Sequence, residues 1–178
     1  RDANPFFHLM EAIWMLAGRA DAAFLTRYAK QLGAYAEDNG RIHGAYGYRW
    51  RDRLGYDQLP IIISKLRTNP EDRQAVLQMW DCTPEYDSMN EGCDDLRGSW
   101  KDRPCNTHAY FRVRGDRGMV NRGHGDVQDY DERVLDMTVC CRSNDAIWGA
   151  YGANAVHFSV LQEYVAAAIG VGVGRYYQ

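Results

Sequence analysis

Two kinds of hydrophobic spacing occur in this chain, and the order in which they follow one another restricts its fold. Apolar and polar residues alternate in AVLQMW (75–80), AYFRV (109–113) and VLDMTVCC (134–141), a period of two that predicts β-strands. A polar, glycine-rich segment, residues 115–133, joins the last two strands, and we interpret it as an extended hairpin tip or a mobile loop. Because the strands adjoin through hairpins more than through helices, the pattern predicts an α+β fold.

Other segments carry apolar residues at the spacing of an amphipathic helix. Asn4 and Pro5 form a cap and first-turn pair for the first of them. The glycine-rich aromatic segment 43–50 is interpreted as a loop at a strand edge, and the glycines of 170–174 as a helix C-cap. The predicted helices run from Asn4-Pro5 to Gly18, from Asp21 to Asn39-Gly40, from Gln58 to Arg67 and from Gly152 to about Ile169.

Length and composition are those of a single globular domain over residues 1–178, with 46% hydrophobic and 25% charged residues. A net charge of −3 argues against broad electrostatic binding of nucleic acid or of an acidic membrane. No apolar run is long enough to span a bilayer, and the first residues do not resemble a signal peptide. Since the chain starts at Arg1 without a methionine and stops abruptly at Gln178, we expect that parts of both termini are missing.

The five cysteines are an odd number at irregular spacing, which fits neither a disulfide framework nor a zinc site. The neighbours Cys140 and Cys141 point to opposite faces of a strand, so they cannot chelate one ion together. We therefore expect no metal and a reducing, cytoplasmic environment.

Cys105 follows a proline at the start of a predicted strand, in RPCNTHAYF (103–111). Two interpretations are open, because free cysteine is among the most buried residue types and its thiolate is also a nucleophile. A thiolate needs a cationic or polar environment, and Arg103 offers a positive charge nearby.

A second polar cluster lies in CRSNDAIWGAYGAN (141–154), between a predicted strand and the last helix. Arg142 and Ser143 place a guanidinium fork beside a hydroxyl, a combination that suits a phosphate. Ser, Asn and Asp also form turns, and the glycines permit tight geometry, so a plain strand-to-helix turn is the alternative.

Taken together, these segments resemble the thymidylate synthase family. Six motifs occur in the family's order and cover nearly all of the chain except residues 115–133, and the form CRSNDAIWGAYGAN is most similar to members encoded by bacterial viruses. The matching features are Glu11 in HLMEAIWMLAG (8–18) for the family's H-E-x-x-W helix, GAYGYRWR (44–51) for its G-x-x-Y-G-x-x-W-R segment, DRQAVLQMWD (72–81) for its R-R-x-x-x-x-x-W-N strand, Pro104-Cys105, Arg142-Ser143-x-Asp145, and Gly149 with Asn154.

The resemblance implies the transfer of one carbon from 5,10-methylenetetrahydrofolate to a pyrimidine nucleoside monophosphate, with dUMP favoured. The Cys105 thiolate would add to C6 of the base, and C5 would then attack the methylene group of the folate. Glu11 and its bound waters would relay protons, and Tyr46 would line the pocket near the cysteine. Tyr35 and Tyr46 are core residues by default, and only the resemblance assigns Tyr46 to the site.

The binding residues of the family are carried over one by one. Arg142 and Ser143 would hold the 5′-phosphate, and Arg73 would reach across a homodimer with shared sites to the phosphate bound by the other subunit. The remaining assignments are Asn154 for the edge of the base, Asp145 for the pterin ring and for catalysis, and Trp14 for the folate.

The chain departs from the family pattern at three places. Asn106 follows the cysteine where most members have histidine, and Gln74 replaces the second arginine of the family's pair. Gly149 and Asn154 are five residues apart where the family usually has four, which leaves either Asn154 or Ala153 beside the base. Uracil and cytosine both stay open, because the amide is the group that discriminates between their edges.

The product is open as well, since hydride from the folate gives a methyl group and water gives a hydroxymethyl group. The alternative to an enzyme is a non-catalytic, nucleotide-binding or structural member of the same fold, supported by Gln74 and by residues 115–133. His8 and His157 are interpreted as surface or satisfied core histidines. A viral member would act in the host cytoplasm.

Overall fold

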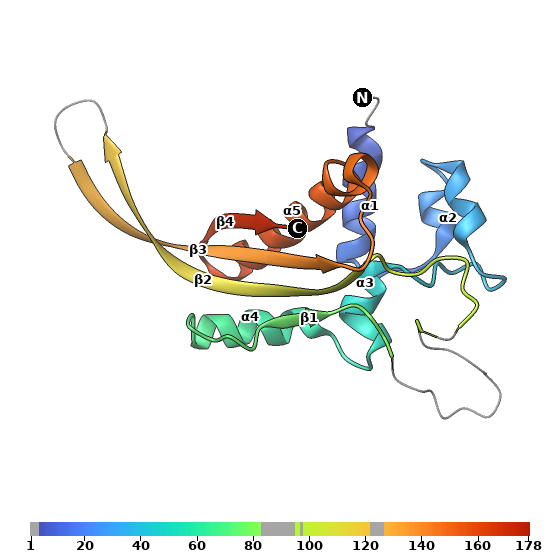
Figure 1. The fold of residues 1–178 in the computed structure, drawn as a ribbon, viewed down its shortest axis with the longest axis horizontal. Coiled ribbons are helices and arrows are strands. Elements are labelled where there is room, and N and C mark those ends of the chain that lie inside the picture. Colours follow the sequence, from blue (N-terminus) through green and yellow to red (C-terminus); the bar gives the residue numbers. More distant parts are fainter. Residues whose placement is uncertain (1–3, 83–94, 97, 122–126) are drawn as a thin grey trace.

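The computed structural model describes residues 4–82, 95, 96, 98–121 and 127–178, with the backbone alone for 116–121 and 127–132. Helices precede and follow a long central hairpin (Figure 1). In chain order the elements are α1 (Pro5–Leu16), α2 (Ala22–Leu25), the 3₁₀ helix η1 (Lys30–Tyr35), α3 (Tyr46–Tyr48), the π-helical turn η2 (Arg49–Arg53), α4 (Gln58–Thr68), β1 (Val76–Gln78), β2 (Asn106–Asn121), β3 (Val127–Cys141), the π-helical turn η3 (Ala146–Ala150), α5 (Ala153–Ile169) and β4 (Gly172–Tyr177).

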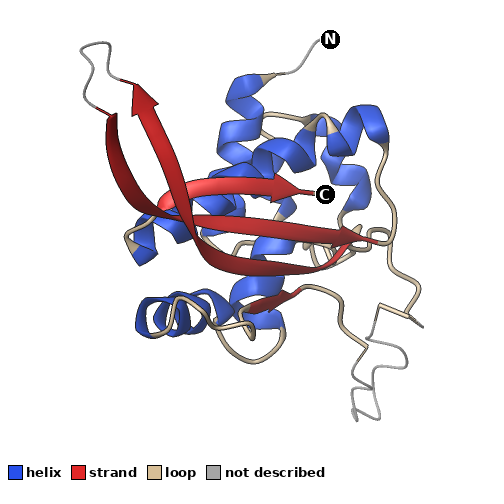
Figure 2. Ribbon diagram, turned by 60° about the vertical axis from the view of Figure 1, so that its left-hand side comes forward, coloured by secondary structure: helices blue, strands red, loops and turns tan. Residues whose placement is uncertain are grey.

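A mixed sheet with the strand order β1-β2-β3-β4 forms the centre of the fold, which confirms the predicted α+β class. β1 pairs with β2 and β2 with β3 in antiparallel register, whereas β3 and β4 are parallel. A parallel pair needs a crossover connection, and α5 supplies it. Figure 2 shows the β2–β3 hairpin extending beyond the helices.

One face of this sheet is buried and the other is exposed, as the alternation in the sequence predicts. α4 and α5 cover the buried face and contact each other. Full burial of a large apolar side chain contributes roughly 1.5–3 kcal/mol, so this layer is a main source of stability. Its buried residues include Ala109, Phe111 and Val113 of β2, Leu135, Met137 and Val139 of β3, and Phe158, Leu161 and Val165 of α5.

The first helix begins where the sequence predicts. The Asn4 side chain accepts a hydrogen bond from the Phe7 N–H at 3.1 Å, and Pro5 occupies the first turn, where an N–H has no helical partner. The helix ends at Leu16, and Gly18 then turns the chain with a left-handed φ of 69°. α1 contacts both α3 and α5, the elements with which it forms the site described below.

The prediction of one helix from Asp21 to Asn39-Gly40 is wrong beyond its first turn. Asp21 caps α2 by accepting from a backbone N–H, but α2 stops at Leu25 and the chain continues through η1. The Ile42 N–H donates to the carbonyl of Ala20 at 2.8 Å, so the two ends of the segment lie side by side. A continuous helix would separate those ends by roughly 25 Å, which excludes this hydrogen bond.

Residues 43–50 are partly helical, and their interpretation as a loop at a strand edge is wrong. α3 and η2 form here because their side chains are drawn into the core, with Arg49 and Trp50 both fully buried. Gly47 lies directly against the backbone of α1, and a Cβ at this position would stand 1.8 Å from the carbonyl oxygen of Met15. Only glycine permits this approach.

The hairpin alternative for residues 115–133 is confirmed, because 115–121 pair with 127–133, whereas 122–126 lie outside the described residues. Gly170 is the expected C-cap with φ 89°, but the strand β4 that follows was not predicted, since its glycines obscure the alternation. Within the described ranges, no helix has both the length and the apolar character needed to cross a membrane.

Replacing Gly47 by alanine tests the close approach of α3 to α1. A methyl group placed against a backbone carbonyl forces the two helices apart, and overpacking of this kind costs about 1–3 kcal/mol or more. Urea titration of the Gly47→Ala variant should show that loss in the free energy of unfolding. Gly33→Ala is the matched control, because its Cβ meets only Thr26 Cγ2 at an ordinary 3.5 Å, and an equal loss there would contradict the explanation.

Candidate active site

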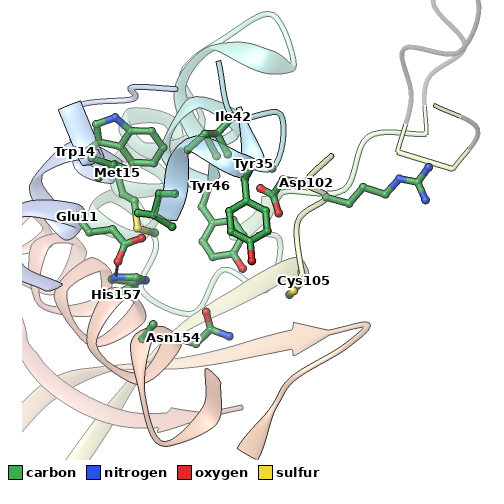
Figure 3. Close-up of a pocket in the computed structure, with 16 residues that line it drawn as sticks. Glu11, Trp14, Met15, Tyr35, Ile42, Tyr46, Asp102, Cys105, Asn154 and His157 are labelled. Carbon is green, nitrogen blue, oxygen red and sulfur yellow. Dashed lines mark ion pairs between the residues drawn. The ribbon is translucent and has the colours of Figure 1, made fainter. Parts of the chain in front are cut away.

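A pocket of about 240 Å³ lies between α1, α3, α5 and the segment that precedes β2. Its volume lies somewhat below the range of about 300–1,000 Å³ that is typical of small-molecule sites. Figure 3 shows Glu11 and His157 on one side of the pocket and Cys105 on the other, with Tyr46 between them. The pocket brings together the following residues that the sequence predicts for the site: Glu11, Trp14, Tyr46, Cys105 and Asn154.

Cys105 lies in the wall of this pocket, directly before β2, and its thiol is partly accessible. The Arg142 N–H donates to the Cys105 carbonyl at 2.9 Å, and the Arg142 side chain donates from Nε to the carbonyl of Pro104 at 2.9 Å. These bonds tie the start of β2 to the end of β3. The thiol is therefore held by the sheet and faces a cavity that a ligand can enter.

A buried ion pair holds the segment that leads to Cys105. Arg49 is completely buried and donates to both carboxylate oxygens of Asp95, at 2.6 and 2.8 Å. His43 also contacts this carboxylate at 2.8 Å, and its ring stacks on Trp100 at 3.9 Å between centroids. Burial alone would raise the pKa of Asp95, but hydrogen bonds from His43 and Arg49, together with the charge of Arg49, outweigh it and lower the pKa to about 2.

Two further titratable groups face the pocket next to the cysteine. Burial raises the pKa of the Asp102 carboxyl, although the charges of Arg49 and His43 act in the opposite direction. Burial also raises the pKa of the Tyr46 hydroxyl, which therefore stays protonated and can donate a hydrogen bond. Figure 3 shows Asp102 on the same side of the pocket as Cys105.

Glu11 of α1 meets His157 of α5 across the base of the pocket. Their Oε2 and Nε2 atoms are 2.8 Å apart, and the side chains are only 17% and 5% exposed. His8 Nδ1 lies 4.0 Å from the same oxygen, so three atoms of metal-ligand type fall within 4.8 Å of one another. Ligands of a tetrahedral zinc ion stand roughly 3.3 Å apart. The contact between Glu11 and His157 is shorter, and among the described residues neither Glu11 Oε2 nor His157 Nε2 has a hydrogen-bond partner of acceptable geometry.

Asn154 lies in the first turn of α5 and is 8% exposed. Its Nδ2 donates to Asn144 Oδ1 at 3.2 Å, which orients the amide. A Cβ on Gly149 would come within 2.2 Å of that same Asn144 oxygen, so glycine makes room for the amide pair. Ala153 lines the pocket beside Asn154, and the extra residue in the sequence therefore does not remove the amide from it.

Four of the predicted residues lie outside this pocket. The Arg142 guanidinium binds backbone carbonyls, and Asp145 caps η3 by accepting from the N–H groups of Ile147 and Trp148 at 2.9 and 2.6 Å. Ser143 is exposed beside Arg142, and Arg73 is exposed in the turn before β1. The functional roles of these four residues stay predictions.

Sequence reasoning did not assign Asp102, Tyr35 or His157 to the site, yet all three line the pocket. A usable signal existed for His157, which follows Asn154 by three residues and therefore shares its helix face. Asp102 precedes Cys105 by three residues in a segment without periodicity, and nothing in the pattern indicates where its side chain points.

Comparison with known proteins identifies the family of this chain. The profile of the family described as Thymidylate synthase matches residues 6–178, and the chain belongs to this family. It is 48% identical, over all of its length and 43% of the relative's, to the deoxyuridylate hydroxymethyltransferase of Pseudomonas phage M6. The corresponding protein of Bacillus phage SP01 is 35% identical, with 100% of this chain and 42% of that protein covered. The chain thus spans less than half the length of these relatives.

The fold also matches solved structures. The thermostable thymidylate synthase A from Bacillus subtilis superimposes with a TM-score of 0.63 at 23% identity, covering 96% of this chain and 53% of that one. At this level of identity the match supports the fold alone.

Asp102 should make stability depend on pH in a defined direction. Because its pKa is raised in the folded state, the folded protein keeps this proton to higher pH than the unfolded chain, whose carboxyl titrates near 3.8. Folding stability contributed by this group is present below that value and is lost as pH rises through the folded pKa. Asp102→Asn should therefore gain stability relative to the parent protein at about pH 7.5 but not at about pH 4, as measured by urea titration.

Asp95→Asn is the control, because the pKa of Asp95 is lowered in the folded protein whereas that of Asp102 is raised. The lowered pKa of Asp95 contributes folding stability above pH 3.8, and this contribution is lost only as the pH falls through about 2. The variant should lose about 3–5 kcal/mol, by an equal amount at both pH values, because it leaves Arg49 buried without its partner. If Asp102→Asn changed the free energy of unfolding by the same amount at both pH values, the raised pKa of Asp102 would be contradicted.

Proposed function

We propose that this protein transfers one carbon from 5,10-methylenetetrahydrofolate to C5 of dUMP and releases the 5-hydroxymethyl nucleotide. The observation that carries the proposal is the presence of Cys105, Glu11, Tyr46 and Asn154 in one pocket. The names of the two phage relatives support uracil as the base and water rather than hydride in the last step. Titratable groups gathered in one cavity favour an enzyme over a non-catalytic member of the fold.

In the proposed reaction the Cys105 thiolate adds to C6, which makes C5 a carbon nucleophile. C5 attacks the methylene group of the folate and loses its hydrogen as a proton, and tetrahydrofolate departs, leaving an exocyclic methylene on C5. Water adds to this methylene, and Cys105 leaves from C6 as a thiolate. Glu11 is the carboxylate available for proton transfer on the side of the pocket opposite the thiol.

The binding roles follow from the same proposal. Asn154 would hydrogen-bond the edge of uracil, and its tether to Asn144 supports this by fixing the amide. Arg142 and Ser143 would hold the phosphate at the open side of the site. Trp14 and Asp145 would contact the folate; Trp14 lines the pocket, and its Nε1 donates to the carbonyl of Asp21 at 3.1 Å.

The exposed face of the sheet supports a homodimer, in which Arg73 would reach the phosphate of the other subunit. In register across the four strands lie Val76, Tyr110, Thr138 and Tyr177. Three of these are apolar or aromatic and are 37%, 46% and 45% exposed. An exposed row that is mostly apolar or aromatic is typical of a protein interface.

Cys105→Ala tests the proposed function directly. The variant should still bind dUMP, but it should release no tritium from [5-³H]dUMP in the presence of methylenetetrahydrofolate, because no C6 adduct can form. The parent protein should release tritium and form tetrahydrofolate with a hydroxymethyl nucleotide, both identified by mass spectrometry. Cys140→Ala is the matched control, since Cys140 lies on β3 outside the pocket. Tritium release by the Cys105 variant at the parent rate would refute the mechanism.

Tyr110→Lys tests the dimer. A lysine in the middle of a buried apolar row leaves an unpaired charge, so the dissociation constant should rise at least about tenfold, measured by sedimentation equilibrium. Tyr56→Lys is the control, because Tyr56 is 55% exposed but lies in the turn before α4, away from the sheet. A dimer unaffected by Tyr110→Lys would place the interface elsewhere.

A further inference from the structure

Two buried polar atoms meet at the base of the pocket and have no hydrogen-bond partner within the part of the chain that the structure describes. They are Oε2 of Glu11 and Nε2 of His157, which lie 2.8 Å apart. Buried polar groups in folded proteins are nearly always satisfied, because an unsatisfied one has lost the hydrogen bonds that water gave it. A species that binds both atoms at once would satisfy this pair.

A third donor atom lies beside these two. Nδ1 of His8 is 4.0 Å from the same Glu11 oxygen, and all three atoms fall within 4.8 Å of one another. His8 and Glu11 share one face of α1, because they are three residues apart, and His157 comes from α5, which packs against α1. The cluster is thus carried by two helices in contact, which is the kind of support that fixes the ligands of a metal.

The separations of the three atoms suit one metal ion. Atoms bonded to an ion at about 2.0–2.1 Å stand roughly 2.9 Å apart when the two bonds are at right angles and at most roughly 4.2 Å apart when the bonds are opposite. From Glu11 Oε2, the distance to His157 is 2.8 Å, close to the first value, and the distance to His8 is 4.0 Å, within the second. The remaining pair is separated by no more than 4.8 Å, so a movement of roughly 0.6 Å closes the cluster around an ion.

We propose that Glu11, His157 and His8 bind a divalent transition-metal ion such as zinc at the base of the pocket. Two imidazole nitrogens and one carboxylate oxygen are a ligand set that zinc and iron(II) accept, whereas magnesium and calcium prefer oxygen alone. Three protein ligands leave at least one coordination position for water, as in catalytic zinc sites. Glu11 and His157 line the pocket, so an ion can reach them from the cavity.

A shared proton is the other species that could join Glu11 to His157, and the geometry favours the metal. An N–H donates along the line from nitrogen to oxygen, and the contact between these two side chains does not have the geometry of a hydrogen bond. An ion bonded to both atoms lies to one side of that line, so its ligands need not point at each other. Figure 3 shows the second carboxylate oxygen of Glu11 directed away from His157, which leaves it for the proton transfer of the proposed reaction.

The expectation of no metal rested on the cysteines alone, whereas the donors here are two histidines and a glutamate from two helices. The metal site goes beyond the proposed function, because metal binding can be measured without substrate and without turnover.

Zinc titration by isothermal calorimetry tests the site in the whole chain, and the parent protein should bind zinc. His157→Leu removes one ligand and Glu11→Gln removes the charge of another. Each should weaken zinc binding at least about 100-fold, because loss of an outer-shell partner alone already costs about 10- to 100-fold. His108→Leu and Glu163→Gln are the matched controls and should keep the parent affinity, since His108 lies on β2 outside the pocket and Glu163 is exposed on α5. No zinc binding by the parent, or equal weakening in a variant and its control, would overturn the proposal.

X-ray absorption at the zinc edge identifies the atoms around the ion in the parent protein, so this measurement does not depend on any variant folding. We expect nitrogen and oxygen neighbours at about 2.0–2.1 Å and no sulfur at about 2.3 Å. Sulfur in the spectrum, or a loss of zinc affinity in Cys105→Ala, would place the ion on the thiol across the pocket and overturn the proposal. Displacement of zinc by magnesium would overturn it as well, because imidazole is a poor ligand for magnesium.

Discussion

The buried guanidinium of Arg49 is the interaction on which the rest of the site depends. Its five N–H donors are all used, by the carboxylate of Asp95 and by the carbonyls of His43 and Met79. A fully buried charge is tolerated only with such complete pairing, and loss of one partner costs about 3–5 kcal/mol. The pair joins η2 to the end of β1 and to the segment that continues to Cys105. The position of Cys105 thus depends on an ion pair whose two residues do not line the pocket.

The residues of the pocket are held in place by two kinds of structure. Glu11, Asn154 and His157 are carried by α1 and α5, helices whose inner faces belong to the core. Cys105 and Asp102 come from an irregular segment, which hydrogen bonds to Arg142 and the stacking of Trp100 on His43 hold in place. Asp102 is only partly exposed, and its surroundings raise the pKa of its carboxyl, a feature that is common at functional sites.

Much of the fold could be predicted from spacing, because the alternation in β2 and β3 and the caps of α1 and α5 are local signals. The break after Leu25 could not, since it results from the pairing of Ala20 with Ile42, two residues far apart in the sequence. Cys105 and Glu11 were found through the order of motifs. Arg49 was not recognised, because a polar residue gives no sign in the sequence that a distant partner will bury it. His157 was missed although its spacing from Asn154 places both residues on one face of α5.

Arg142, at the end of β3, is hydrogen-bonded through its guanidinium group to the segment that carries Cys105. Its guanidinium uses Nε and one Nη atom to bind the carbonyls of Pro104 and Arg103, and the described residues engage none of its remaining N–H groups. The same side chain can therefore grip an anion while it still braces the turn that carries the thiol. Lysine, a single point charge without a planar fork, could not do both. If Arg142 holds the phosphate, as proposed, a substitution of this one side chain would disturb both the binding of the nucleotide and the placement of Cys105.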